Sequence, residues 1–162
     1  MQKFLINGPC KVMGQVVISG SKNASLAILA ATLLFDRPVE IKNLPAVRDI
    51  DTMLKLLKSL GLNISLKKNK KSVLISRSKN INNLASYSLV KTMRAGILVL
   101  GSLIAKYHKS ITSLPGGCLI GARPVNYHLN ALNKLGMKYK IRKGYIHAKS
   151  LGKLKGTDIK FS

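Results

Sequence analysis

Negative charge is nearly absent from this sequence of 162 residues. Five Asp and Glu stand against 28 Lys and Arg, which gives a formal net charge of +23. The sequence contains no pair of carboxylates, no cluster with metal-ligand spacing, no Ser/His/Asp grouping, and no GxGxxG or P-loop motif. These absences argue against catalysis by paired carboxylates, and we expect neither a metal nor any other cofactor.

Cysteine and long apolar segments are also scarce. The two cysteines, Cys10 and Cys118, are too few for a disulfide framework and suit a reducing compartment. The longest apolar runs, 24–35 and 95–105, are shorter than a membrane-spanning helix, and the first residues lack a signal-peptide pattern. We therefore expect a cytoplasmic protein that has no membrane partner.

The excess of basic residues would ordinarily suggest nucleic-acid binding. However, the lysines are scattered along the chain, and aromatic residues that would stack on bases make up only 5% of it. The densest basic run, 67–71, lies at a predicted hairpin tip, where charge is usually solvated. We expect no specific nucleic-acid partner, while weak, salt-sensitive adsorption to polyanions remains an alternative role.

The main positive feature is an internal repeat. Residues 39–45 (VEIKNLP) align with 109–115 (KSITSLP), and 48–61 align with 123–136. An apolar helix precedes each copy and two strands follow it. The predicted unit is therefore helix, strand, helix, strand, strand, repeated about every 70 to 75 residues. This pattern predicts an α/β (α+β) fold.

The hydrophobic pattern also places single elements. The expected elements are strands at 4–7 and 12–19, a buried helix at 24–34, a strand at 39–43, an amphipathic helix ending at Leu60, a looser connection at 77–90, and a strand at 157–161. Asp49 or Asp51 would cap the amphipathic helix or complement its dipole. Gly61 would form its C-terminal cap.

The two copies differ at one connection. Two residues separate Pro45 from Arg48, whereas seven separate Pro115 from Arg123, so the second copy carries five additional residues. This glycine-rich insertion contains Cys118, and Arg123 follows at a predicted helix start. A guanidinium and a helix N-terminus both favour a thiolate. We predict that Cys118 is functional, against the alternative of a small apolar residue in a turn.

Two further helix starts carry basic residues. Lys22 and Asn23 begin the first helix, and Arg94 begins the equivalent helix of the second copy. An ammonium or guanidinium beside free backbone amides makes an anion site, although Lys22 taken alone is better explained as a solvated lysine beside a capping serine. His128, one turn past Arg123, would border this site. Together these residues predict a phosphorylated substrate.

Three segments carry a resemblance to a known family: SGSKNA at 19–24, VKTMRAG at 90–96 and LPGGCLIGARPVNYHLNAL at 114–132. Over its whole length the chain resembles the UDP-N-acetylglucosamine 1-carboxyvinyltransferases of the enolpyruvyl transferase family. The resemblance implies an inverted α/β barrel of βαβαββ units. It also implies transfer of the enolpyruvyl group from phosphoenolpyruvate to the 3-hydroxyl of UDP-N-acetylglucosamine, the first committed step of peptidoglycan precursor synthesis.

The resemblance also implies residue roles. Cys118 would protonate the methylene carbon of phosphoenolpyruvate and would be alkylated by fosfomycin. Phosphoenolpyruvate would contact Lys22, Asn23 and Arg123, and the UDP-sugar would contact Arg94, Arg123, Pro124, Val125, Asn126 and Tyr127. Two positions depart from the family pattern: Asn126 stands where an aspartate is usual, and Leu98 replaces an aromatic residue.

Length is the larger departure, because family members have two domains. The resemblance implies that residues 1–20 are strands of the other domain, and that 21–162 are part of the UDP-sugar-binding domain. Within it the repeat copies lie at about 21–76 and 91–149, and a third begins at 156–162. The aspartate base for the sugar hydroxyl is missing, so we expect a truncated chain, inactive alone, that a second polypeptide could complete. The alternatives are a non-catalytic UDP-sugar or anion-binding module and a basic polyanion-binding protein.

Overall fold

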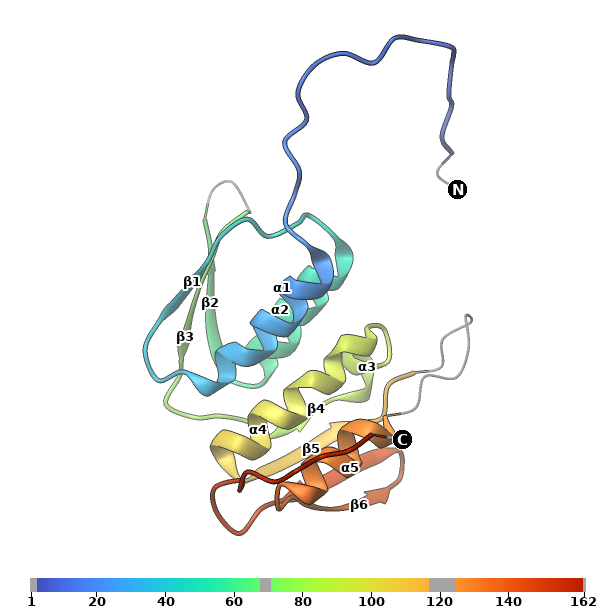
Figure 1. The fold of residues 1–162 in the computed structure, drawn as a ribbon. Coiled ribbons are helices and arrows are strands. Elements are labelled where there is room, and N and C mark those ends of the chain that lie inside the picture. The colour runs from blue at the N-terminus through green and yellow to red at the C-terminus, as the bar shows by residue number, and fades with distance from the viewer. Residues whose placement is uncertain (1–2, 68–70, 117–124, 162) are drawn as a thin grey trace.

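Helices packed between two sheets form the body of the molecule (Figure 1). The structure is a computed structural model that describes residues 3–67, 71–116 and 125–161. Residues 3–20 extend away from this body as an arm, and the described C-terminal residues lie beside the second sheet (Figure 1).

The first repeat forms a three-stranded sheet covered by two helices. Its elements are α1 (Lys22–Ala31), the 3-10 helix η1 (Thr32–Leu34), β1 (Val39–Ile41), α2 (Arg48–Ser59), β2 (Leu62–Leu66) and β3 (Val73–Arg77). The strand order is β1-β3-β2, with both pairs antiparallel. Ile41, Val73 and Ile75 are buried against the helices. Because side chains alternate along a strand, the intervening residues face outward.

The second repeat forms the same arrangement. Its elements are the 3-10 helix η2 (Arg94–Leu98), α4 (Val99–Tyr107), β5 (Lys109–Ser113), α5 (Asn126–Lys134), β6 (Lys138–Arg142) and β7 (Tyr145–Lys149). Strands β5, β7 and β6 lie in the same first-third-second order as in the first repeat. The predicted repeating unit of helix, strand, helix, strand, strand is therefore confirmed.

The connection between the repeats is more ordered than predicted. Residues 77–90 contain β4 (Leu84–Ala85), which pairs in parallel with β5, and the one-turn helix α3 (Tyr87–Val90). The prediction of a loose connection was wrong here because β4 gains its hydrogen bonds from the edge of a distant strand, a contact that local sequence does not encode.

Helix α2 is amphipathic, as predicted. Ile50, Met53 and Leu57 are each at most 4% exposed and lie on its buried face. Gly61 follows the helix with φ of +97°, a left-handed conformation that glycine adopts readily. The N-cap residue is Val47, which makes no side-chain capping bond. Asp49 and Asp51 lie in the first turn, where their charge complements the helix dipole.

Polar contacts join the two repeats. Asp36 forms ion pairs with Arg77 of β3, at 3.0 Å, and with Lys106 of α4, at 2.6 Å. The Ser102 hydroxyl of α4 donates to the Ala30 carbonyl over 2.9 Å in a buried position. The hydrogen bond from Lys106, with that from Arg77, lowers the pKa of Asp36 below its ordinary value. Asp36 therefore helps to fix one repeat against the other.

The expected strands near the two ends are absent. Residues 3–20 contain no strand, and apolar side chains such as Phe4 and Val17 are more than 90% exposed. Residues 157–161 likewise form no strand. A strand needs a neighbour for its backbone hydrogen bonds, and neither segment has one among the described residues. No helix in the described parts of the chain is long and apolar enough to cross a bilayer.

Candidate active-site cleft

The start of α1 is held close to the loop after β1. Ser21 is the N-cap, and its hydroxyl accepts a hydrogen bond from the Ala24 amide at 3.4 Å. A Cβ at Gly20 would lie 1.9 Å from the carbonyl oxygen of Asn43, so only glycine fits there. The sequence SGSKN thus fixes where Lys22 enters the molecule.

Lys22 faces an acidic partner from the second helix of the same repeat. Its Nζ lies 2.9 Å from Oδ2 of Asp49, and the two side chains are 48% and 35% exposed. Asp49 reaches this position because α1 and α2 pack side by side with their N-terminal ends adjacent. The predicted anion site therefore contains one carboxylate that sequence analysis assigned only to helix capping or charge.

The residues around this ion pair form a surface cleft of about 270 Å³. Its lining combines two basic side chains, one carboxylate, one imidazole, one amide and several apolar groups: Lys22, Asn23, Leu26, Asp49, Met93, Arg94, Ala95, Ile97, Leu98 and His128. The cleft thus brings together four of the predicted site residues: Lys22, Asn23, Arg94 and His128. Arg94 follows Asn23 by more than 70 positions in the sequence, and His128 follows Arg94 by more than 30.

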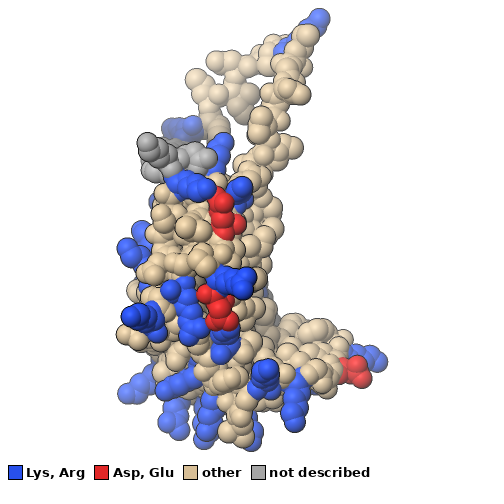
Figure 2. Space-filling view, turned by 90° about the vertical axis from the view of Figure 1, so that its left-hand side faces the viewer, with Lys and Arg blue, Asp and Glu red and all other residues tan. Residues whose placement is uncertain are grey.

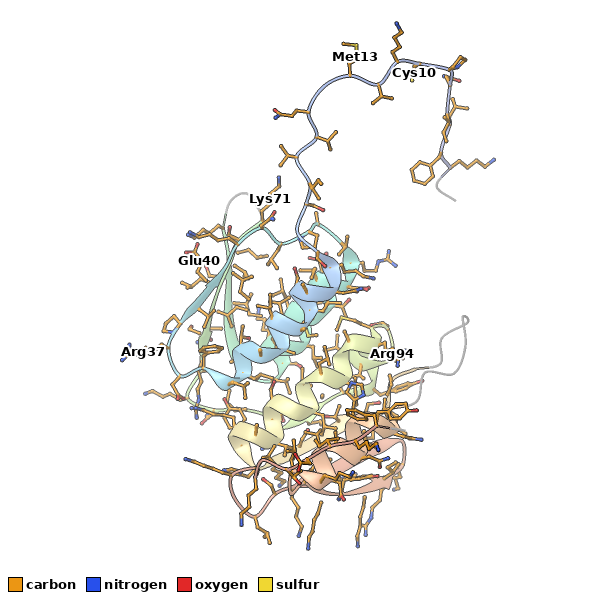
Figure 3. All side chains as sticks on the ribbon, viewed as in Figure 1. Cys10, Met13, Arg37, Glu40, Lys71 and Arg94 are labelled. Atoms are coloured by element: carbon orange, nitrogen blue, oxygen red, sulfur yellow. The ribbon has the colours of Figure 1, made fainter. Side chains whose placement is uncertain are left out.

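Arg94 enters the cleft at the first residue of η2, as predicted for a helix start. Figure 3 shows it on the side of the molecule where α3 and the second sheet meet. Leu98, one of the two departures from the family pattern, also lines the cleft. It presents an aliphatic side chain where the resemblance implies an aromatic ring, so this wall offers packing without a π-face for stacking.

The start of α5 provides the opposite border. The helix begins at Asn126 after the buried N-cap residue Val125, so its start lies later than the position predicted for Arg123. His128 lines the cleft from the first turn of α5. The Tyr127 ring packs edge-on against Phe161 with 6.0 Å between ring centroids. Tyr127 thereby joins the end of the described chain to α5.

Three predicted site residues, Cys118, Arg123 and Pro124, lie outside the described residues. Gly116, the last described residue before them, has a hypothetical Cβ that would lie 2.7 Å from the Lys91 carbonyl. Gly116 therefore lies against the segment that leads to Arg94. The other cysteine, Cys10, is exposed on the N-terminal arm far from the cleft (Figure 3).

This arrangement suits an anion more than a metal ion. Within the described ranges, no group of three His, Cys, Asp or Glu residues is placed to hold a metal. Lys22 and Arg94 offer charged donors, and the N-terminus of α1 adds its dipole. An incoming anion would compete with the Asp49 carboxylate for the Lys22 ammonium. Sequence analysis missed this competition because it depends on how two helices pack.

Comparison with known proteins identifies the class. A sequence profile of the EPSP synthase family, EPSP synthase (3-phosphoshikimate 1-carboxyvinyltransferase), matches residues 6–162. The chain belongs to this family of carboxyvinyl (enolpyruvyl) transferases.

Within the family, the chain is similar to enzymes whose name differs from that of EPSP synthase. It is 58% identical over 161 residues to the UDP-N-acetylglucosamine 1-carboxyvinyltransferase of Pelagibacter ubique, and the match covers 99% of this chain and 38% of that protein. It is 51% identical to the enzyme of the same name from Hamiltonella defensa, of which it covers 37%. The chain thus spans little more than a third of the length of these relatives.

Solved structures confirm the fold. The enolpyruvyl transferase NikO from Streptomyces tendae aligns with a TM-score of 0.71 and 16% identity, over 85% of this chain and 29% of that chain. An EPSP synthase from Acinetobacter baumannii aligns with a TM-score of 0.65 and 18% identity, over 89% of this chain and 33% of that one. The predicted enolpyruvyl transferase-like α/β fold, present in part, is therefore confirmed.

Proposed function

We propose that this chain contributes the UDP-N-acetylglucosamine side of an active site that transfers an enolpyruvyl group from phosphoenolpyruvate to the sugar 3-hydroxyl. The main support is the cleft, in which Lys22, Asn23, Arg94 and His128 converge from both repeats. The names of its similar relatives supply the substrate and the donor group. In this role the protein acts in the cytoplasm, early in the synthesis of peptidoglycan precursors.

The proposed chemistry uses an acid on the loop and cations in the cleft. The Cys118 thiol gives its proton to the methylene carbon of phosphoenolpyruvate, and the sugar hydroxyl attacks the cationic carbon and loses its proton to a base. The tetrahedral intermediate then expels phosphate and loses a proton from its new methyl group to a base, which restores the double bond. Lys22 and Arg123 would stabilise the phosphate charge, because preorganised cations act strongly where water is excluded. The thiol position is also where fosfomycin would form its adduct.

The nucleotide would lie toward the second repeat. Arg94 and the segment 123–127 (Arg123, Pro124, Val125, Asn126 and Tyr127) are the proposed contacts. Asn126 carries no charge where the family usually has an aspartate, so it can donate as well as accept a hydrogen bond to the sugar or the base. Compared with an aspartate, Asn126 removes one negative charge from this segment.

A chain of these 162 residues is expected to bind without turning over. The base for the sugar hydroxyl is not among the candidate residues, and the relatives are more than twice as long. Phosphate release that requires both substrates would contradict this expectation. A second polypeptide that supplies the base would restore turnover.

The direct test is calorimetric titration of the full chain with UDP-N-acetylglucosamine. Binding should need both uridine and sugar and should persist at 0.5 M salt. Arg94→Gln should weaken it at least tenfold, the cost of about one charged hydrogen bond. Arg37→Gln, on an exposed residue outside the cleft (Figure 3), is the matched control. Failure to bind, or equal loss in both variants, would refute the proposed role.

A further inference from the structure

The outer face of the second sheet carries a basic groove that the proposed reaction does not use. The groove has a volume of about 650 Å³, and its lining contains lysine, arginine and histidine without a carboxylate: His108, Lys109, Ser110, Ile111, Lys138, Tyr139, Lys140, Arg142, His147, Ala148 and Lys149. We propose that this basic groove binds the phosphate backbone of single-stranded nucleic acid, independently of base sequence. The proposal goes beyond the proposed function and does not depend on it.

Strand register places the cations in rows. Lys109 of β5 pairs with Lys149 of β7, which in turn pairs with Lys138 of β6. Three exposed lysines thus stand side by side across the sheet. On β6, Lys140 and Arg142 follow at alternate positions on the same outer face. The face therefore presents positive charge both across and along its strands.

This placement is unfavourable without an anion. Directly opposed residues have Cβ atoms about 5 Å apart, and like charges at that distance destabilise a sheet. Residues 91–149, which contain the second repeat, have no Asp or Glu at all. Among the described residues, no ion pair involves the three lysines of the row. A bound polyanion would relieve this repulsion.

The first sheet provides a comparison within the same chain. Its outer face contains Glu40, which forms ion pairs with Lys67 and, at 3.9 Å, with Lys42. Charge on that face is therefore partly balanced. In Figure 2, red side chains lie among the blue ones higher on the molecule and on the projection at the lower right, while the lower margin, formed by the second sheet, is lined with blue. A general abundance of lysine does not account for this difference between the two sheets.

Protection of a sheet edge does not explain the row either. Charged residues on an edge strand discourage pairing with other chains, and β6 is such an edge. However, β5 and β7 lie inside the sheet order β4-β5-β7-β6. Lys149 stands on β7 with Lys109 on one side and Lys138 on the other, so no edge needs protection there, whereas Lys109 lies beyond the two residues of β5 that pair with β4. Edge protection therefore does not account for Lys149, which an anionic ligand explains better.

A nucleic-acid backbone fits the groove better than a membrane or an acidic peptide. Among the residues that line the groove, the one large aliphatic side chain is Ile111, which is half-buried, so the face has little to insert into a bilayer. Exposed five-residue strands are about 17 Å long, enough for a few nucleotides. Tyr139 alternates with the outward-facing lysines of β6, so it is not placed for stacking, and base selectivity is not expected.

The test measures binding of a fluorescein-labelled 12-nucleotide RNA of mixed sequence to the full chain between 0.05 and 0.3 M salt. Lys109→Gln, Lys138→Gln and Lys149→Gln together should reduce the slope of log K against log salt by about 2, since each phosphate contact on a single strand contributes about 0.7. Lys149→Gln alone should reduce it by about 0.7. An oligouridine of equal length should bind within about twofold of the mixed sequence.

The control removes the same charge elsewhere. Lys55, Lys58 and Lys79 are exposed and do not line the groove, so their joint change to Gln should reduce the slope by less than about 0.5. Equal effects of the two triple variants would mean that net charge alone drives binding and would overturn the proposal. Groove-dependent binding to vesicles with 30% phosphatidylserine, in the absence of RNA binding, would also overturn it and would identify a membrane surface instead.

Discussion

Asp49 provides the sharpest quantitative prediction. Its carboxylate forms an ion pair with the Lys22 ammonium, and the proposed substrate needs that same ammonium. An anion that accepts a hydrogen bond from Lys22 would lie within about 6 Å of Asp49, the sum of two hydrogen-bond lengths. Asp49→Asn removes the repulsion between the two negative groups, so we expect it to strengthen anion binding.

The magnitude follows from exposure and distance. The Lys22 side chain is about half exposed and the Asp49 side chain about one-third exposed, so the effective dielectric constant between them is nearer to that of water than to that of a protein interior. At about 6 Å this gives roughly 0.7–1.4 kcal/mol for each unit of anion charge, or about three- to tenfold in affinity. Stability should move the other way, because a first-turn acid and an exposed ion pair are lost, by about 0.5–1.5 kcal/mol.

The assay is an NMR titration of the ¹⁵N-labelled chain with phosphoenolpyruvate, followed at the amide of Asn23. Asp51→Asn is the matched control, because Asp51 lies in the same turn of α2 but does not line the cleft. It should lower stability slightly and leave affinity within twofold. Weaker binding in Asp49→Asn, or an equal gain in both variants, would refute the competition between Asp49 and the anion.

Three further predictions concern stability, all measured by urea denaturation. Leu57→Ala should cost about 2–5 kcal/mol, since Leu57 is fully buried in the first core cluster. Gly61→Ala should destabilise by more than about 1 kcal/mol, because φ is +97° and the new Cβ would meet a backbone oxygen at 2.4 Å; a neutral result would contradict that geometry. Lys106 and Arg77 lower the pKa of Asp36 in the folded protein. Its contribution to the free energy of unfolding is therefore present above the unfolded pKa, near 4, and is lost as the pH falls below that value. Asp36→Asn should flatten the pH dependence of the free energy of unfolding in that range.

Much of the fold follows from periodicity. Residues 39–76 and 109–149 carry matching apolar patterns, and these suffice for the helix-strand-helix-strand-strand order of both repeats. Strand register was less accessible. When the two repeats are aligned on Leu44-Pro45 and Leu114-Pro115, Val39 falls opposite Lys109 in the alignment. In the structure, the position in the second sheet that is equivalent to Val39 is the buried Ser110. A one-residue difference exchanges the two faces of a strand, so sequence alignment alone assigns Lys109, the lysine of β5, to the wrong face.

The errors share a physical cause: they concern contacts with partners distant in sequence. Residues 4–7 and 12–19 have strand-like alternation, but hydrogen bonding to a neighbour decides whether a strand exists. In the candidate cleft, the helix-start rule located Lys22, Asn23 and Arg94. The Lys22–Asp49 pair depends on how α1 packs against α2, and nothing in either local sequence specifies it.

The central claim is that this chain retains a nucleotide-dependent enolpyruvyl transferase site around Cys118. The most direct measurement is intact-mass labelling of the full chain with fosfomycin, with and without UDP-N-acetylglucosamine, followed by digestion to locate the adduct. Exposed Cys10 serves as the internal control. We predict selective labelling of Cys118 that becomes faster with the UDP-sugar. Equal labelling of both thiols, or labelling that ignores the UDP-sugar, would contradict the claim.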